Sequence, residues 1–399
     1  MIDSFPTLHR YQRLPDTMDK MEKARPQQPS RALLAAAGSD AVAAVAASSR
    51  MRCGGCGAKV GATVLSRVLR KLGVAENTGD DAAVVDLRST SVVASVDFFR
   101  SFIDNPFVLG AVAATHAMGD AWAMGTQPCA ALAICQVPHA PAAQTEREVL
   151  ALMAGALHAL NAASCRLVGG HTCEGAELAC GFTILAPAPV QGEQLLRKGG
   201  LHRGDVLLLT KPIGTGTLMA AAAAARASGR HVARALESMR QPQGRAAAVL
   251  LDCGVSGATD ITGFGLLGHA AEMAVASNVQ LRIDLDRVPL LPGAAELAAG
   301  GHASSLAPAN VEAAKGALGS VVAPDVTRHR AYPLIFDPQT AGGLLAGVAP
   351  QRAQEAIRRL VEAGFEHTAV IGEVLAGDDT SSSENLITLR AGTRMNGNS

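Results

Sequence analysis

The chain has 399 residues, and its 35 Lys and Arg balance its 35 Asp and Glu, so its formal net charge is zero. It lacks the basic excess typical of nucleic-acid binders, and an aromatic content of 3% offers few rings for stacking bases. Hydrophobic residues make up 48% and charged residues 18%, which excludes a wholly disordered chain. A chain of this length is expected to form two domains with tails.

The sequence predicts a cytoplasmic protein with reduced thiols. Gly or polar residues interrupt every apolar stretch before it reaches the roughly 20 residues that a membrane-spanning helix needs. The first residues lack the apolar core of a signal peptide, and eight Cys are too few for a disulfide scaffold in a chain of this length.

The first predicted unit follows a polar and Ala-rich tail, residues 1–50, and alternates strands with helices. Apolar residues at helical spacing predict helices at residues 63–72, 107–124 and 146–163. Short Val-rich or apolar runs predict strands at residues 82–87, 90–96, 130–137, 165–168 and 179–186.

The second predicted unit begins with a strand at residues 205–210 and a Gly-rich turn. Its predicted helices are residues 217–227, 232–239, 244–251 and 266–276, and further strands are expected near residues 280–283 and 343–348. We expect an α/β or α+β protein with domains at residues 51–195 and 200–375 and a second tail at residues 376–399.

Cys53 and Cys56 form a C-x-x-C pair in a Gly-rich strip that ends at Lys59. The spacing suits half of a zinc site, but the sequence has no second pair of this kind. Alternatively, the strip carries a thiol and an ammonium group to a substrate, with Lys59 favouring the thiolate of Cys56. Spacing alone favours a Gly-rich start of the domain in which neither thiol has a function.

Aspartates stand at the ends of predicted elements. Asp80 and Asp81 precede one strand, Asp97 ends the next, and Asp260 lies in a Gly-rich loop of the second unit. Carboxylates placed in this way hold Mg²⁺ on phosphates in many proteins. Each one alone is equally explained by a solvent-facing or loop-capping side chain. The sequence contains no Walker A pattern, so a nucleotide site here would not be a P-loop.

Asp120 falls within the apolar helix predicted at residues 107–124, with His116 one turn before it on the same face. A carboxylate among apolar side chains is costly unless it is paired or holds a metal.

Two Gly-rich segments follow predicted strands. Gly169 and Gly170 allow close approach to the backbone, so His171 and Thr172 could donate to a ribose or a phosphate. Residues 211–216, at a strand-to-helix junction, are also suited to phosphate. Ordinary turns explain both segments as well. The loops that begin at residues 260 and 337 resemble each other, each with an aspartate, a threonine and glycines.

Taken in order, eight motifs resemble those of the selenophosphate synthetase family, the selenide, water dikinases. The resemblance covers about residues 52–374. The motifs are GGCGAK (54–59), GDDAAVVDL (79–87), VDFFRSFIDNPFVLG (96–110), GDAWAMG (119–125), VGGHT (168–172), LTKPIGTG (209–216), TDITGFGLLGH (259–269) and FDPQTAGGLL (336–345).

The resemblance implies the two-domain fold of the aminoimidazole ribonucleotide synthetase superfamily, in which the N-terminal domains of a homodimer pair into a β-barrel. It implies that ATP binds in the N-terminal domain with Mg²⁺ on its phosphates. The implied reaction converts ATP, selenide and water to selenophosphate, AMP and orthophosphate. Neither a nucleic acid nor a membrane is expected as a partner, whereas a selenium-delivery protein or an oxidoreductase is.

Matched residue by residue, the resemblance implies that Cys56 and Lys59 are catalytic. The implied metal ligands are Asp81, Asp120 and Asp260. The implied ATP contacts are Lys59, Asp80, Asp97, Asp120, Gly170, His171 and Thr172, with Thr78 and Gly79 beside them.

Three positions depart from the familiar family pattern. Ala58 replaces a second Cys, so a redox pair with Cys56 is impossible, His116 replaces an Asn, and residues 302–310 differ from the expected motif. The GGCGAK form also resembles members fused behind a flavin-dependent oxidoreductase, which makes residues 1–50 a candidate remnant linker. The alternatives are another ATP-dependent enzyme of the superfamily, which would not need the Cys–Lys pair, and a non-catalytic ATP-binding or zinc-binding module.

Overall fold

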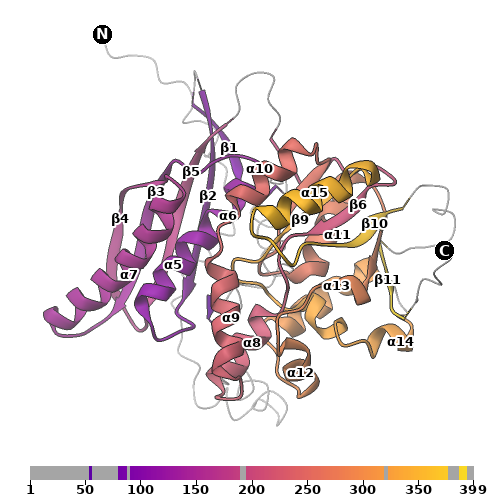
Figure 1. Ribbon diagram of the computed structural model, residues 1–399. Helices are drawn as coiled ribbons and strands as arrows, with labels where there is room; N and C mark the ends of the chain where they lie inside the picture. The colour runs from indigo at the N-terminus through magenta and orange to yellow at the C-terminus, as the bar shows by residue number, and fades with distance from the viewer. Residues whose placement is uncertain are drawn as a thin grey trace, which may run out of the picture. The chain divides into compact units, whose positions relative to one another are not determined.

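The computed structural model describes residues 54–55, 80–87, 90–188, 195–318, 322–375 and 386–392. Its strands form two sheets with helices packed around them (Figure 1). The N-terminal tail and the helix predicted at residues 63–72 lie outside the described residues, as do Cys53, Cys56, Lys59, Thr78 and Gly79. No helix within the described ranges is both long and apolar enough to cross a bilayer.

The first sheet has five strands in the order β1-β2-β5-β3-β4. Strand β4 pairs with β3 in parallel, and the other neighbours are antiparallel. The strands are β1 Ala83–Leu87, β2 Thr90–Arg100, β3 Ala130–Pro138, β4 Arg166–Gly175 and β5 Ala179–Pro187. All five were predicted, although β2 and β4 extend well beyond their predicted ends.

Helices α5, Pro106–Ala117, and α7, Ala142–Ala162, cover one face of this sheet (Figure 1). Two glycines bring their backbones together: a Cβ atom on Gly110 would lie 1.9 Å from the carbonyl oxygen of Leu152, and one on Gly155 would lie 1.8 Å from that of Phe107. The helices therefore pack through backbone contacts that no larger residue would permit.

The single helix predicted at residues 107–124 is wrong, because the chain forms two helices that are separated at Met118. Helix α5 ends at Ala117, and α6 spans Gly119–Ala123. Asp120 consequently lies in the first turn of α6 and is only partly buried. An apolar helix interior is therefore not its environment.

Strand β4 corrects a second prediction. Residues 169–172, which the sequence places after the end of a strand at residue 168, lie inside this edge strand. Its pairing with β3 shifts register between Ala131 and Leu132. Gly170 has a φ of +155°, and a Cβ atom there would lie 2.2 Å from the carbonyl oxygen of Ala133. The glycines thus allow an irregular strand to continue at a point where sequence rules predict that it ends.

The second sheet has six strands in the order β11-β8-β10-β6-β9-β7, and only the β11–β8 pair is parallel. Its strands are β6 Val206–Leu209, β7 Gly257–Asp260, β8 Leu281–Asp284, β9 Leu344–Val348, β10 Ala369–Val374 and β11 Ile387–Arg390. Strands β7 and β10 were not predicted. Strand β11 lies within residues 376–399, the segment predicted as a C-terminal tail.

The helices of this second part are α8 Thr215–Ala223, α9 Gly229–Arg240, α10 Gly244–Asp252, α11 Gly265–Ser277, α12 Ala294–Ala299, α13 Ala307–Leu318, α14 Pro324–Thr327 and α15 Pro350–Glu362. The first four match the predicted helices closely, whereas α12 to α15 were not predicted. Short 3₁₀ turns occur at Leu285–Arg287 and Tyr332–Phe336.

The two sheets share one hydrophobic core. Leu208 of β6 and Leu344 of β9 belong to the same buried cluster as Trp122 of α6 and Leu152 of α7. The alternate residues of the strands, such as Leu207, face a second cluster around α11. The loop before β9 contacts the end of α5 at His116, and the end of β7 contacts the start of α6 at Gly119.

Candidate active site

Asp81 and Asp260 lie close together where the two sheets meet. The Oδ1 atom of Asp81 accepts hydrogen bonds from Thr259 Oγ1 at 2.9 Å and Lys198 Nζ at 3.0 Å. Burial raises the pKa of Asp81 to about 7; the negative charge of Asp260 adds to this shift, and Lys198 opposes it. Residues from both sheets therefore form one acidic junction.

Asp120 directly follows Gly119, and Gly119 lies beside this junction. A Cβ atom on Gly119 would lie 2.6 Å from Asp260 Oδ2, so the start of α6 touches this carboxylate. The structure thus places the backbone that precedes Asp120 beside Asp260, and the shared metal role of Asp81, Asp120 and Asp260 stays a prediction.

Asp80 has a different set of partners. It forms an ion pair with Arg197, and its Oδ1 atom accepts from the backbone N–H of Lys198 at 3.3 Å. Its buried carboxylate therefore holds the segment that precedes β6.

His116 joins three segments. Its Nδ1 atom accepts from the backbone N–H of Ala341 at 3.0 Å, so its proton is on Nε2, which lies 3.6 Å from Asp97 Oδ1. The Phe99 ring packs edge-on against the imidazole. The predicted placement of His116 on one helical face with Asp120 is wrong, because the helix breaks between them.

The Gly-rich strip is described only at Gly54 and Gly55. Gly55 has a φ of +58°, and a Cβ atom there would lie 2.8 Å from Thr340 Oγ1 and 3.3 Å from the Phe102 ring. The residues that directly precede Cys56 in the sequence thus contact the loop that also donates to His116. The proposed roles of Cys56 and Lys59 stay predictions, because both residues lie outside the described ranges.

The residues predicted on β4 do not join this cluster within one chain. Asp97 and Gly170 stand in one cross-strand row with two strands between them, which separates their backbones by roughly 14 Å. His171 pairs in register with Ile134 on the open face of the sheet, and both His171 and Thr172 are exposed. The side chain of Asp97 instead points toward His116 on the helix-covered face.

The phosphate site considered at residues 211–216 is already filled by the protein. Gln339 Oε1 accepts from the backbone N–H groups of Gly214 and Thr215, at 2.9 and 3.1 Å, and from Thr215 Oγ1. A side chain from the loop before β9 thereby takes the donors at the start of α8 that a phosphate would need. The two loops whose sequences resemble each other also touch, since Gln339 N donates to Thr262 O at 2.9 Å.

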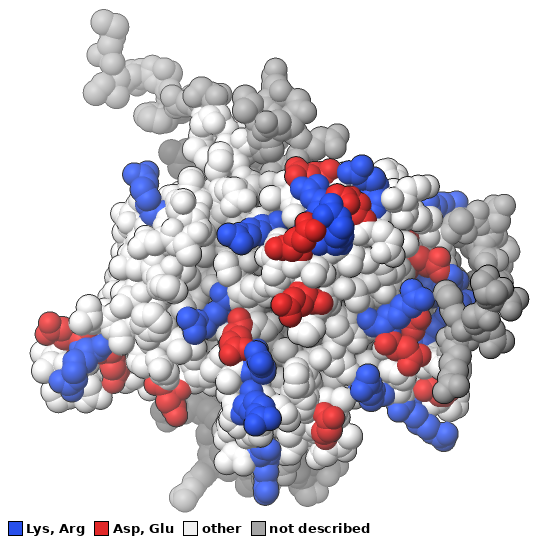
Figure 2. All heavy atoms as spheres, in the orientation of Figure 1, with Lys and Arg blue, Asp and Glu red and all other residues white. Residues whose placement is uncertain are grey.

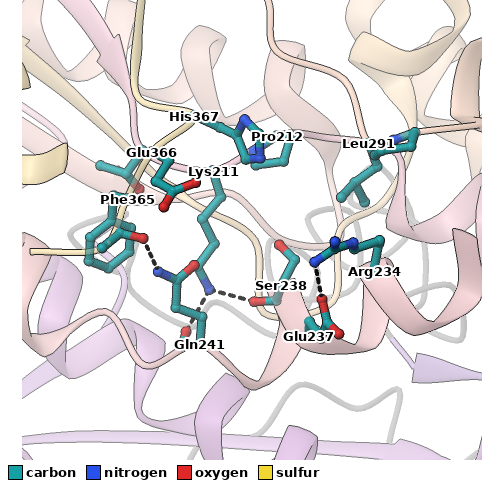
Figure 3. A pocket seen from close by; sticks show the side chains of 13 residues that line it. Lys211, Pro212, Arg234, Glu237, Ser238, Gln241, Leu291, Phe365, Glu366 and His367 are labelled. Atoms are coloured by element: carbon teal, nitrogen blue, oxygen red, sulfur yellow. Dashed lines mark hydrogen bonds and ion pairs between the residues drawn. The ribbon is translucent and has the colours of Figure 1, made fainter. Parts of the chain in front are cut away.

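Lys211 lines a pocket of about 620 Å³, and neither Asp81 nor Asp260 is among the lining residues (Figure 3). Its Nζ atom donates to the carbonyl oxygens of Ser238, Gln241 and Ala341, at 3.0, 2.7 and 3.2 Å. Burial lowers the pKa of Lys211 to about 7, and Asp260 opposes that shift. Because three carbonyl groups occupy its donors, Lys211 braces the loops beside the junction rather than offering a free cation.

The sequence interpretation missed Lys198. Although burial opposes its charge, the carboxylates of Asp81 and Glu272 hold the pKa of Lys198 above its usual value. A single lysine between two domains belongs to no recognisable pattern, so only the folded chain shows that it reaches Asp81.

The acidic junction suits a divalent cation that prefers oxygen ligands, such as Mg²⁺. Two buried carboxylates that repel each other there would gain from a shared positive charge. Among the residues that the structure describes, however, no three His, Cys, Asp or Glu side chains are gathered closely enough to form a metal site by themselves. Oxygen atoms of a bound nucleotide would have to complete the coordination.

Family models identify the two halves of the chain. Residues 79–186 match AIR synthase related protein, N-terminal domain, and residues 202–383 match the corresponding C-terminal domain. A thiamine-monophosphate kinase from Aquifex aeolicus has a similar fold, with a TM-score of 0.57 at 15% identity over 79% of this chain and 94% of that one. The hydrogenase maturation protein HypE in complex with ATP gives 0.56 at 17% identity, over 78% and 85%. The fold is thus the two-domain α/β fold of AIR synthase related proteins.

Curated relatives narrow this class to one family. Selenide, water dikinases are 37% identical in Caldanaerobacter subterraneus, over 77% of this chain and 89% of the relative, and 36% identical in Escherichia coli, over 80% and 92%. The chain belongs to the selenide, water dikinase family, which confirms the resemblance found in the motifs. The dimeric barrel and the domain boundaries stay predictions, and both sheets are open among the described strands.

Proposed function

We propose that the protein makes selenophosphate from ATP, selenide and water, with AMP and orthophosphate as the other products. The observation that carries this proposal is the junction of Asp81 and Asp260, contributed by the two domains of a chain that is 37% identical to a selenide, water dikinase. Because the reaction consumes ATP and a reduced selenium compound, we place it in the cytoplasm.

ATP phosphates and hydrogen selenide are both anions, so the site must reduce their repulsion before they react. In this proposal Asp81, Asp120 and Asp260 would hold Mg²⁺, which would supply positive charge beside the phosphates. Lys59 adds a positive charge at the end of the Gly-rich strip. The thiol of Cys56 is the catalytic group that acts on the selenium substrate. The proposed ATP contacts are Lys59, Thr78, Gly79, Asp80, Asp97, Asp120, Gly170, His171 and Thr172.

We also propose a homodimer that covers the open face of the first sheet. Val96, Phe98, Leu132 and Val168 expose 59, 46, 37 and 53% of their surface, and all four belong to strands of that sheet. Burial of neighbouring apolar side chains favours association. His171 shares this face through its partner Ile134, so a dimer would bring the β4 residues into an interface.

The partners in this proposal are small anionic substrates and not a nucleic acid. Figure 2 shows basic and acidic side chains interspersed over the visible face, without a broad basic area. The further partner proposed here is a selenium-delivery protein or an oxidoreductase that supplies reduced selenium.

The proposal is tested by ³¹P NMR of the protein with ATP and Mg²⁺ under anaerobic conditions, with and without selenide. We expect AMP, orthophosphate and a phosphorus signal split by selenium to appear only when selenide is present. ATP consumption that is independent of selenide and yields ADP would instead support another ATP-dependent reaction of the superfamily.

A further inference from the structure

A chain of polar side chains leads away from Asp81 into the second domain. The Nζ atom of Lys198 lies 3.0 Å from Asp81 Oδ1 and 2.8 Å from Glu272 Oε2. The same oxygen of Glu272 is 3.1 Å from His269 Nδ1, and His269 Nε2 is 3.2 Å from Thr262 Oγ1. The chain therefore connects the start of β1 to α11 and to the loop that follows β7.

The backbone around Lys198 is fixed from several sides. Its N–H donates to Asp80, the carbonyl oxygen of Arg197 accepts from Ala258 N at 2.9 Å, and Leu201 N donates to Ser277 Oγ at 3.1 Å. The Lys198 side chain is only 9% exposed. Because both its backbone and its surroundings are constrained, its ammonium group has a defined position.

Lys198 and Glu272 form an ion pair. Burial opposes ionisation of Glu272, but His269 and Lys198 lower its pKa to about 2. The ammonium of Lys198 thus lies between two carboxylates, of which one, Glu272, belongs to none of the predicted sites. Glu272 thus contacts both Lys198 and His269 and gives Lys198 a second carboxylate partner besides Asp81.

The two carboxylate oxygens of Asp81 differ in the hydrogen bonds that they accept. Both Lys198 and Thr259 donate to Oδ1, whereas Oδ2 accepts no hydrogen bond from the part of the chain that the structure describes. A carboxylate held through one oxygen presents the other in a fixed direction. Groups that orient metal-binding carboxylates in this way are typically worth 10- to 100-fold in metal affinity.

We propose that Lys198 is a positioning residue for Asp81, and that Glu272 and His269 hold Lys198 in its working position. This inference rests on the proposed function, in which Asp81 binds the cation that accompanies ATP. A role limited to structure would leave cation binding unaffected when Lys198 is replaced.

The test measures Mn²⁺ binding by electron paramagnetic resonance in the full chain, with a non-hydrolysable ATP analogue present. We expect Lys198→Met to weaken binding roughly tenfold or more. Lys198→Arg, which keeps the charge, should recover part of this loss. Glu272→Gln should weaken binding in the same direction and to a smaller extent, although Glu272 contacts none of the proposed metal ligands.

Lys315→Met is the matched control, because Lys315 pairs with Glu312 on an exposed surface and its replacement removes the same charge. Unchanged or tighter Mn²⁺ binding in Lys198→Met would overturn the inference, and unchanged binding in Glu272→Gln would do so if Lys198→Met failed to fold. Asp81→Asn separates the two proposals. If it too leaves Mn²⁺ binding unchanged, the proposed metal role of Asp81 itself is wrong.

Discussion

Gly119 and Asp260 touch across the two domains, because a Cβ atom on Gly119 would lie 2.6 Å from Asp260 Oδ2. Side chains larger than hydrogen cannot occupy this position unless the carboxylate moves. Gly119 begins α6 and is followed at once by Asp120, and Asp260 ends β7. The glycine therefore lets the carboxylate of one domain lie directly beside the acidic helix start of the other.

Gly119→Ala is expected to reduce selenide-dependent ATP turnover roughly tenfold or more, because the added methyl group pushes Asp260 out of place. The melting temperature should fall only slightly, since an aspartate side chain can rotate away. Gly316→Ala is the control: it lies in α13 with no atom within 4 Å of the added carbon, so activity should stay normal. Normal turnover in Gly119→Ala would mean that the position of Asp260 does not matter.

Asp260→Ala is expected to lose turnover while the fold and the oligomeric state remain, as circular dichroism and size-exclusion chromatography would check. In the unmodified protein, ATP with Mg²⁺ should slow hydrogen exchange in residues 53–59, because ligand-ordered segments open less often. This protection should shrink in Asp260→Ala. A variant with normal turnover and normal protection would leave Asp260 as a turn residue.

Asp120→Asn is expected to remove activity at ordinary Mg²⁺ concentrations, because the amide keeps the shape of the side chain but not its charge. Turnover measured over a Mg²⁺ titration should show a higher requirement for the ion. A fully active and more stable variant would show that the carboxylate is a structural liability at the start of α6.

Cys56→Ser is expected to abolish selenide-dependent turnover and leave ATP binding intact, whereas Cys53→Ser should be mild. Only Cys56 has the family spacing to Lys59. The measurements are ATP turnover, nucleotide binding and the zinc content of the purified protein. Equal losses in both variants together with stoichiometric zinc would favour the C-x-x-C metal interpretation.

Hydrophobic periodicity located most helices and strands. It failed where contacts between distant segments determine where a helix or strand ends. The apolar pattern continues through Met118, so it does not reveal the break that places Gly119 against Asp260. The glycines of β4 likewise predict a turn, because pairing with β3 is not visible in the sequence. Tertiary contacts outweigh local signals in both places.

The proposed site was visible mainly through motif resemblance. Between Asp81 and Asp260 the chain forms the whole first sheet and then the segment from β6 to β7, and only folding shows that their charges interact. Lys198 and Gln339 carry no pattern that predicts their partners. At the start of α8 the sequence predicts too much: its glycines suit a phosphate, but the side chain of Gln339 accepts from the backbone N–H groups there.

Asp337 offers a stability test that does not depend on turnover. It is fully buried, its Oδ1 accepts from Thr217 Oγ1 at 2.8 Å and its Oδ2 accepts from Gln339 Nε2 at 3.0 Å. Burial raises the pKa of Asp337 from 3.8 to about 6, although these hydrogen bonds oppose the shift. The folded state therefore binds a proton more readily than the unfolded chain does.

The sign of the pH effect follows from this difference. Stability from protonation of Asp337 is fully present below pH 3.8 and is lost as the pH rises through about 6. Asp337→Asn cannot titrate, and its amide would face a donor of Gln339 or Thr217, so it should be less stable by about 1–3 kcal/mol. Urea unfolding of both proteins across this pH range should show the difference between them shrinking with rising pH and levelling above about pH 7. A difference that is constant or grows over that range would show that Asp337 titrates near its ordinary pKa, and that its hydrogen bonds outweigh its burial.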